Sequence, residues 1–372
     1  MSNMSPPRLL HLAQKSLLGH EALAILSLDQ LPREMFPALF LEAFNRRLLN
    51  ILKAMVRVWP FDFLRLGPLM KRKQVDNLKA VLDGIDLMYA QNSDSRRGKL
   101  HVLDLRDAGR NIWNVWAGAY ACSPELKLRR QPVESGPSQL KVIANICLPE
   151  VIQDEFLPHL LLWVKERASL VHLCCHQLKI SVKNIHTFSR VLDVLELGCI
   201  QEVQVDSAQL LFTLGELAPY LDGMSSLHTL CVSHYGLLNH VTPEHQELFN
   251  SYFASQLAKL PHLRSLHMAS VCFLEHNLEQ VLSSHLNAML PALSQCYQLT
   301  TFNFGNSISM AMMEELLEHT GNLSALRVEQ YPAPLESYHT QGIAHGRFFQ
   351  HCTELLLRLK RIRRPKFSTV PC

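Results

Sequence analysis

The sequence has no apolar stretch long enough to cross a membrane. No uninterrupted apolar run reaches about 18 residues, the length that a spanning helix needs. The N-terminal residues also lack the basic segment, apolar core and small-residue cleavage site that mark a secretory signal. We therefore expect a protein that is neither secreted nor bound to a membrane.

Catalytic motifs are missing as well. The 19 histidines, with many serines and aspartates, make chance triads easy to draw. None of them lies in a nucleophile elbow, a glycine-rich phosphate loop or a metalloprotease helix. We therefore predict that the chain is not an enzyme and holds neither a cofactor nor a metal.

One short segment contains four potential zinc ligands, His172, Cys174, Cys175 and His176. Alternate residues of a strand face opposite sides, so Cys175 would point into the core and the other three would share the opposite face. A tetrahedral site would need one more ligand, and the paired spacings of closed structural sites are absent. The segment therefore favours a structural role.

The charge excess is small and the cysteines are dispersed. The formal net charge of +3 is too small to indicate a nucleic-acid partner, and we expect no direct contact with nucleic acid. Three of the ten cysteines, Cys175, Cys199 and Cys231, fall within the apolar repeats described next, where a thiol packs as a small apolar group. We expect reduced cysteines and a cytoplasmic location, with the nucleus as the second candidate.

An apolar spacing, Leu-x-x-Leu-x-Leu or a close variant, returns along the second half of the chain. It occurs at Leu170/Leu173/Cys175, Ile200/Val203/Val205, Leu227/Leu230/Val232, Leu263/Leu266/Met268, Leu299/Phe302/Phe304 and Leu323/Leu326/Val328. These starts are 30, 27, 36, 36 and 24 residues apart, in the period range of leucine-rich repeats. Such repeats stack a strand and a returning helix into a curved solenoid. The sequence therefore predicts an α/β fold, a leucine-rich-repeat horseshoe preceded by helices.

We predict three segments along the chain. Residues 1–95 form a helical adaptor region. Residues 96–167 contain a first strand-like repeat, an exposed loop rich in proline and serine, and a connecting helix. Residues 168–372 form the solenoid and end in a basic tail.

Several stretches together resemble the PRAME family, germline-expressed leucine-rich proteins that include the oogenesins. They are Leu31-Pro32-Arg33-Glu34-Met35-Phe36-Pro37, Trp59-Pro60-Phe61, Leu78-Lys79-Ala80-Val81-Leu82-Asp83-Gly84, Lys99-Leu100-His101-Val102-Leu103-Asp104-Leu105-Arg106 and Tyr331-Pro332-Ala333-Pro334-Leu335-Glu336-Ser337-Tyr338. The chain resembles a shortened member, because the region from about Val281 to Ala292 joins what the family separates by additional repeats.

This resemblance implies the substrate-recognition subunit of a cullin-2 RING ubiquitin ligase, which promotes proteasomal degradation of a protein substrate. The implied partners are elongin B/C, cullin-2 and a substrate on the concave repeat face. Elongin binding in such receptors uses the helical pattern Leu-x-x-x-Cys-x-x-x-aliphatic. Leu9, Ala13 and Leu17 fit it with alanine in place of cysteine, and a second register runs through Leu18, Ala22 and Leu26.

The cullin-2 pattern, apolar-Pro-x-x-apolar-x-x-x-apolar, follows in the expected order. Leu31, Pro32, Met35 and Leu39 satisfy it. Any amphipathic helix also repeats apolar residues every three to four positions, so each pattern taken alone favours ordinary packing. Their order and the family resemblance together favour the adaptor interpretation.

The alternative is a non-enzymatic transcriptional corepressor or scaffold that affects proliferation, differentiation and apoptosis. Leu157, Leu160 and Leu161 match the Leu-x-x-Leu-Leu spacing of helices that enter nuclear-receptor grooves, although they also fit a helix that faces the core. The basic run at 358–366 fits a nuclear import signal or a solvated helix end.

Overall fold

The computed structural model describes residues 9–72, 75–90, 100–107, 139–149, 155–181, 185–207, 210–234, 252, 254–260, 262–270, 289–305, 308–339 and 342–362. The chain divides into two compact units, Met1–Ala144 with Gln153–Leu173 (unit 1) and Asn145–Ile152 with Cys174–Cys372 (unit 2).

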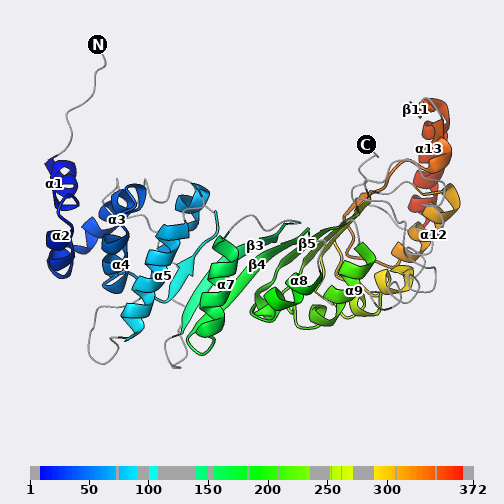
Figure 1. Cartoon of the computed structure of the whole chain (residues 1–372). Helices are drawn as coiled ribbons and strands as arrows, with labels where there is room; N and C mark the ends of the chain where they lie inside the picture. Colours follow the sequence, from blue (N-terminus) through cyan, green and yellow to red (C-terminus); the bar gives the residue numbers. More distant parts are fainter. Residues whose placement is uncertain are drawn as a thin grey trace, which may run out of the picture. The chain divides into compact units, whose positions relative to one another are not determined.

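The strands of the described residues form two sheets. They are β1 (Phe63–Arg65), β2 (Val102–Asp104), β3 (Leu140–Leu148), β4 (Val171–Ile180), β5 (Glu202–Ser207), β6 (Thr229–His234), β7 (Ser265–Ser270), β8 (Thr301–Phe304), β9 (Val328–Gln330), β10 (Tyr338–His339) and β11 (Gly342–Ile343). The first nine form one sheet in chain order, and β10 pairs with β11 (Figure 1). The α/β prediction is confirmed.

The described helices of unit 1 are interleaved with its strands, since four precede β1, one lies between β1 and β2, and one follows β3. They are α1 (Leu9–Leu17), α2 (Glu21–Ser27), α3 (Phe36–Asn45), α4 (Leu49–Arg57), α5 (Val75–Ala90) and α7 (Phe156–Glu166), with 3₁₀ turns η1 (Leu28–Gln30), η2 (Arg33–Met35) and η3 (Gly67–Arg72). Pro37 lies in the first turn of α3, where its missing N–H is not needed. A Cβ on Gly84 would lie 2.6 Å from the Lys53 carbonyl oxygen, so glycine permits the close packing of α4 and α5.

Aromatic side chains fill the core of unit 1. The Trp59 ring centroid lies 5.2 Å from that of Phe40 and 6.1 Å from that of Phe36, both in edge-to-face geometry. All three side chains are buried. The N-terminal helices are therefore held by packing rather than by their own short lengths.

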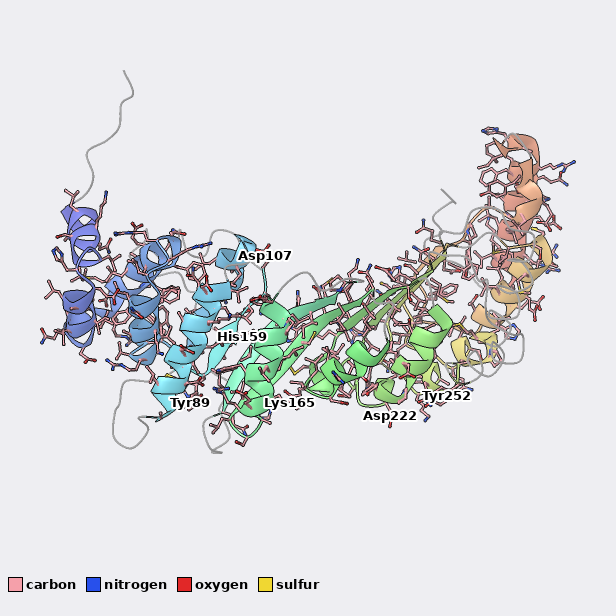
Figure 2. The ribbon with its side chains drawn as sticks, in the orientation of Figure 1. Tyr89, Asp107, His159, Lys165, Asp222 and Tyr252 are labelled. Atoms are coloured by element: carbon pink, nitrogen blue, oxygen red, sulfur yellow. A yellow bond between two sulfur atoms is a disulfide. The ribbon has the colours of Figure 1, made fainter. Side chains whose placement is uncertain are left out.

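An ion pair joins α5 to α7 within unit 1. Arg167 donates to the Asp86 carboxylate from Nε at 2.6 Å and from Nη2 at 2.8 Å, and the Trp163 indole N–H donates to it at 3.2 Å. Figure 2 shows these two helices side by side, with Tyr89 and Lys165 near their C-terminal ends.

Two strands were not anticipated from the sequence. β1 lies inside the region predicted to be helical, where three residues are too few to show a period. β3 has a clear alternation, with Leu140, Val142, Ala144, Ile146 and Leu148 all buried. We predicted an exposed loop and a connecting helix in this part of the chain and no strand between them, so β3 was not foreseen. The predicted strand around Leu103 is confirmed as β2.

We predict that a carboxylate at the end of β2 makes unit 1 sensitive to acid. Arg106 donates to Asp104 from its backbone N–H at 3.1 Å, from Nε at 3.0 Å and from Nη2 at 2.9 Å. Burial opposes ionisation, but these hydrogen bonds and the positive charges of Arg106 and Arg65 lower the pKa of Asp104 below its usual value. The ionised form therefore stabilises the fold above the unfolded-state pKa of about 3.9, and this stabilisation is lost as the pH falls through the folded-state pKa.

The test is Asp104→Asn, which should cost about 1–3 kcal/mol of unfolding free energy at pH 7. Urea denaturation at pH 7, 5 and 3 measures this cost. We expect it to shrink as the pH falls below 4. An equal cost at all three pH values would contradict the prediction.

Unit 2 repeats a strand followed by a return segment. Its helices are α8 (Ile185–Leu192), α9 (Leu210–Leu221), α12 (Met310–Thr320) and α13 (His345–Ile362), with 3₁₀ turns η5 (Leu197–Cys199) and η6 (Leu335–Ser337). The second to fifth predicted apolar sets are all buried, which confirms their assignment to the core. Figure 1 shows α8 and α9 covering one side of β4 and β5. None of the helices in the described ranges is long and apolar enough to cross a membrane.

The first and last predicted repeats are confirmed only in part, because Leu173, Cys175, Leu323 and Leu326 are buried as predicted, whereas Leu170 is 44% exposed. In β4 the buried positions change phase between Cys175 and Leu178, and Leu178 pairs with Val203 of β5. In β9 the register places Glu329, not an apolar residue, beside Phe302. Val328, predicted to be in the core, is 42% exposed, whereas Glu329 is buried and accepts a hydrogen bond from the Tyr331 hydroxyl.

The cysteine prediction was wrong in two respects. Cys174 and Cys199 form a disulfide, so the expectation that all cysteines are reduced does not hold. Cys174 is buried and bonded to Cys199, so it does not share an exposed face with His172 and His176 as expected. Cys231 is only half-buried because its neighbours Leu230 and Val232 take the core positions.

Candidate interaction surfaces

One face of the unit 2 sheet is polar and accessible. Register pairing places two rows of half-buried or exposed side chains across strands β4 to β9: Gln177, Glu202, Thr229, Ser265, Thr301 and Val328 in the first row, and Lys179, Gln204, Cys231, His267, Asn303 and Gln330 in the second. We call these two rows the polar face. Parallel sheets usually carry apolar residues on both faces because helices cover both. The polar composition therefore indicates a face that meets water or a partner.

Hydrogen bonds order the β3–β5 end of the polar face. Asn145 Nδ2 donates to Gln177 Oε1 at 2.7 Å, and Gln177 Nε2 donates to Glu202 Oε2 at 3.0 Å. Lys179 lies 3.0 Å from Asp206, whose hydrogen bond and charge raise the pKa of the lysine. These side chains are thus fixed before any partner binds, which lowers the entropy cost of association.

The centre of the polar face is mostly uncharged. From β6 to β8 it presents three hydroxyl groups, the Cys231 thiol, the His267 imidazole and the Asn303 amide. Cys231 stays a thiol at neutral pH because burial, then the charges of Glu202 and Asp206, raise its pKa. Hydroxyls and amides bind polar protein surfaces by hydrogen bonding. The arrangement suits recognition rather than chemistry.

In unit 1 the first predicted elongin register lies on a single helix. Leu9 is the first residue of α1 and its side chain lies outside the described residues. Ala13 is exposed and Leu17 is half-buried. The helical spacing that the pattern requires is therefore present in α1.

The second register crosses a helix break. α1 ends at Leu17, so Leu18 lies in the turn before α2 and is buried. Ala22 is exposed on α2, and Leu26 is 78% exposed. This register therefore lacks a continuous helix, although Leu26, its last residue, is largely exposed to solvent.

The predicted cullin residues are placed unevenly. Leu31 and Met35 are half-buried and Pro32 is exposed around the 3₁₀ turn η2. Leu39 is only 1% exposed and packs in the core of α3. Leu31, Pro32 and Met35 are therefore accessible at least in part, whereas Leu39 is not.

Sequence reasoning missed two features of these surfaces. Leu12 and Leu23 are large exposed apolar residues on α1 and α2, and they extend the accessible surface near Ala13 and Leu26. Apolar residues at these positions were visible in the sequence, but their outward direction was not. Cys174, Glu196 and Cys199 also bring their ligand atoms within 4.8 Å of one another, whereas the four-residue cluster predicted at 172–176 is split between the core and the opposite side of β4.

These features define a repeat protein that offers one ordered polar face and a set of accessible N-terminal helices. Comparison with known proteins gives its family. Residues 6–113 match the PRAME N-terminal domain, and residues 140–285 and 283–372 match the PRAME C-terminal domain. The chain belongs to the PRAME family.

Curated relatives match over the whole chain. It is 40% identical over 456 aligned residues to human PRAME family member 12, covering all of this chain and 94% of the relative. It is 38% identical to human PRAME family member 8 and 36% identical to human PRAME family member 10, covering all of this chain and 96% of each.

The comparison confirms that this member is shortened. The two segments that match the C-terminal domain meet at residues 283–285, within the junction predicted from Val281 to Ala292. In the structure, β7 pairs directly with β8, with Leu266 opposite Phe302. The parallel pairing therefore continues across the junction, although residues 271–288 lie outside the described residues.

Proposed function

We propose that this chain is the substrate-recognition subunit of a cullin-2 RING ubiquitin ligase. In this proposal α1 docks elongin C through Leu9, Ala13 and Leu17, and the turn at Leu31, Pro32 and Met35 contacts cullin-2. The observation that supports it most directly is the exposed apolar surface of α1 and α2, since large apolar groups left accessible together mark interaction sites.

The substrate site in this proposal is the polar face. Its repeats would stack as a leucine-rich horseshoe with this face on the concave side. The subunit would work by positioning, because holding a substrate lysine near a charged conjugating enzyme raises its effective concentration without new chemistry in this chain. It would act in the cytoplasm or the nucleus, with a protein substrate and without contact to membrane or nucleic acid.

The decisive experiment is a pull-down of elongin B/C and cullin-2 by the full chain and by a chain lacking residues 1–17. This deletion removes α1 but keeps the Phe36, Phe40 and Trp59 core, so unit 1 should stay folded. We expect the full chain to capture both partners and the deleted chain to capture neither. A chain lacking residues 363–372 is the matched control and should capture both.

A corepressor or scaffold role is the second candidate. Lys360 and Arg361 are exposed at the end of α13, immediately before the basic residues of the tail, which favours contact with an import receptor. This role predicts nuclear enrichment that depends on residues 363–372, and complexes that survive removal of α1. If the folded full chain captured neither elongin nor cullin-2, the ligase proposal would be abandoned for this one.

A further inference from the structure

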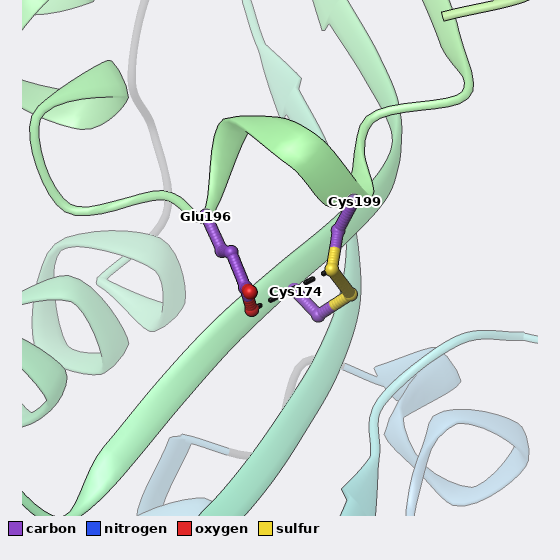
Figure 3. Close-up of a disulfide and its surroundings, with 3 residues drawn as sticks. All are labelled: Cys174, Glu196 and Cys199. Atoms are coloured by element: carbon purple, nitrogen blue, oxygen red, sulfur yellow. Dashed lines mark hydrogen bonds between the residues drawn. A yellow bond between two sulfur atoms is a disulfide. The ribbon is translucent and has the colours of Figure 1, made fainter. Parts of the chain in front are cut away.

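Two cysteines in unit 2 lie opposite each other, one on β4 and the other in the turn that leads into β5. Cys174 lies on β4 and Cys199 ends η5, with a Cα–Cα distance of 5.5 Å (Figure 3). Their sequence separation is 25 residues, the same offset that pairs Gln177 with Glu202 in the β4–β5 ladder. The two thiols are therefore brought together by the register of the sheet, three residues before the ladder begins.

The two sulfurs differ in their access to solvent. Cys174 is fully buried, whereas Cys199 is half-buried. The carboxylate of the exposed Glu196 lies 3.5 Å from Cys199 Sγ. In the dithiol form this carboxylate can accept the Cys199 S–H hydrogen bond. Cys199 is therefore the sulfur that a small reagent can reach.

We propose that Cys174 and Cys199 form a reversible thiol–disulfide switch that exchanges with glutathione-class disulfides through Cys199. The Cys199 thiolate attacks one sulfur of glutathione disulfide, forming a mixed disulfide and releasing one glutathione thiolate. Cys174 then loses its proton and attacks Cys199 Sγ, which closes the protein disulfide and releases the second glutathione. Two protein thiols are oxidised, one glutathione disulfide is reduced, and the two protons pass to the released thiolates.

The location of the pair gives this switch a physical consequence. Three residues further along the chain from each cysteine, Gln177 and Glu202 make the hydrogen bond that begins the polar face. A disulfide fixes the distance between the two strands at this point, and its loss frees the short η5 turn that leads into β5. Oxidation therefore stiffens the β4–β5 end of the polar face. Disulfides in reducing compartments are mostly of this transient, sensing kind.

The test uses the full chain in reducing and oxidising glutathione buffers, with peptide mapping and amide hydrogen exchange. In oxidising buffer we expect the Cys174 and Cys199 peptides to be recovered as one linked species. After reduction, amides from 199 to 205 should exchange about ten-fold faster, and the thermal midpoint should fall by about 5–10 °C. Cys199→Ser should abolish the link and the response to buffer.

Cys175→Ser is the matched control, because Cys175 is adjacent, buried and free, and burial raises its pKa to about 11. This variant should keep both the link and the response. Alkylation of both Cys174 and Cys199 in oxidising buffer would overturn the proposal. A second result would also overturn it: the chain retains one zinc ion, and Cys199→Ser abolishes this zinc binding. Cys174, Cys199 and Glu196 would then be metal ligands. Neither the peptide mapping nor the hydrogen exchange involves elongin or cullin-2. The experiment therefore tests the switch independently of the proposed function.

Discussion

Replacing Ala13 with arginine is expected to reduce elongin B/C capture by the full chain about ten-fold or more. The elongin pattern places a small residue at this position because the partner's surface approaches the helix closely. Arginine would hold that surface away by several ångströms. Because Ala13 is exposed and arginine is a good helix former, the variant should leave α1 intact.

Ala22→Arg is the matched control for this prediction. Ala22 is equally accessible on α2 but belongs to the second register, which crosses the break between α1 and α2. We expect this variant to capture elongin as well as the original chain does in a quantitative pull-down. The opposite result, with Ala22→Arg impaired and Ala13→Arg unaffected, would assign elongin to the second register. Unchanged capture by both variants would remove α1 and α2 from the binding surface.

The middle repeats could be predicted because their apolar spacing is set by the sheet itself. Each strand there has one covered face, so a leucine-type residue must appear at alternate positions. Leu230 and Val232 illustrate this, as both are buried where the pattern placed them. The end repeats were predicted only in part, since one residue of each set, Leu170 and Val328, is exposed. A phase change within β4 and a buried glutamate in β9 alter the register without altering the apolar composition that the pattern detects.

The disulfide was missed for the same reason. Its 25-residue separation is meaningful only when the pairing of Gln177 with Glu202 is known. The predicted repeat starts, 30 residues apart, kept Cys174 and Cys199 out of register. A local spacing rule cannot supply a contact whose position depends on how β4 and β5 are aligned.

The candidate surfaces were predicted to different extents. α1 exists and carries the first register, because helical periodicity is a local property. The burial of Leu39 was not foreseen, since it depends on how α3 packs in unit 1. The polar face was expected only as the concave side of a solenoid, and its residues emerged from strand register. Partner identity remains a proposal that rests on the exposed apolar residues of α1 and α2.

Phe302→Ala is expected to cost about 3–5 kcal/mol of unfolding free energy, as for other buried aromatic truncations. Phe302 lies on β8 and is fully buried. Its ring centroid is 6.4 Å from that of Phe304 and 6.0 Å from that of Tyr331. Phe349→Ala, at a 65% exposed position on α13, is the control and should change stability by less than about 0.5 kcal/mol. Urea denaturation followed by circular dichroism measures both.

A double-mutant cycle then tests the pairing across the shortened junction. Leu266 on β7 is the register partner of Phe302 and is also fully buried, so the two truncations should not add independently. We expect an interaction energy of about 0.5–3 kcal/mol between Leu266→Ala and Phe302→Ala. A pairing that does not form in solution would give additive costs within about 0.5 kcal/mol. Coupling would mean that the shortened array remains one continuous sheet, since β7 and β8 meet where the longer relatives carry additional residues.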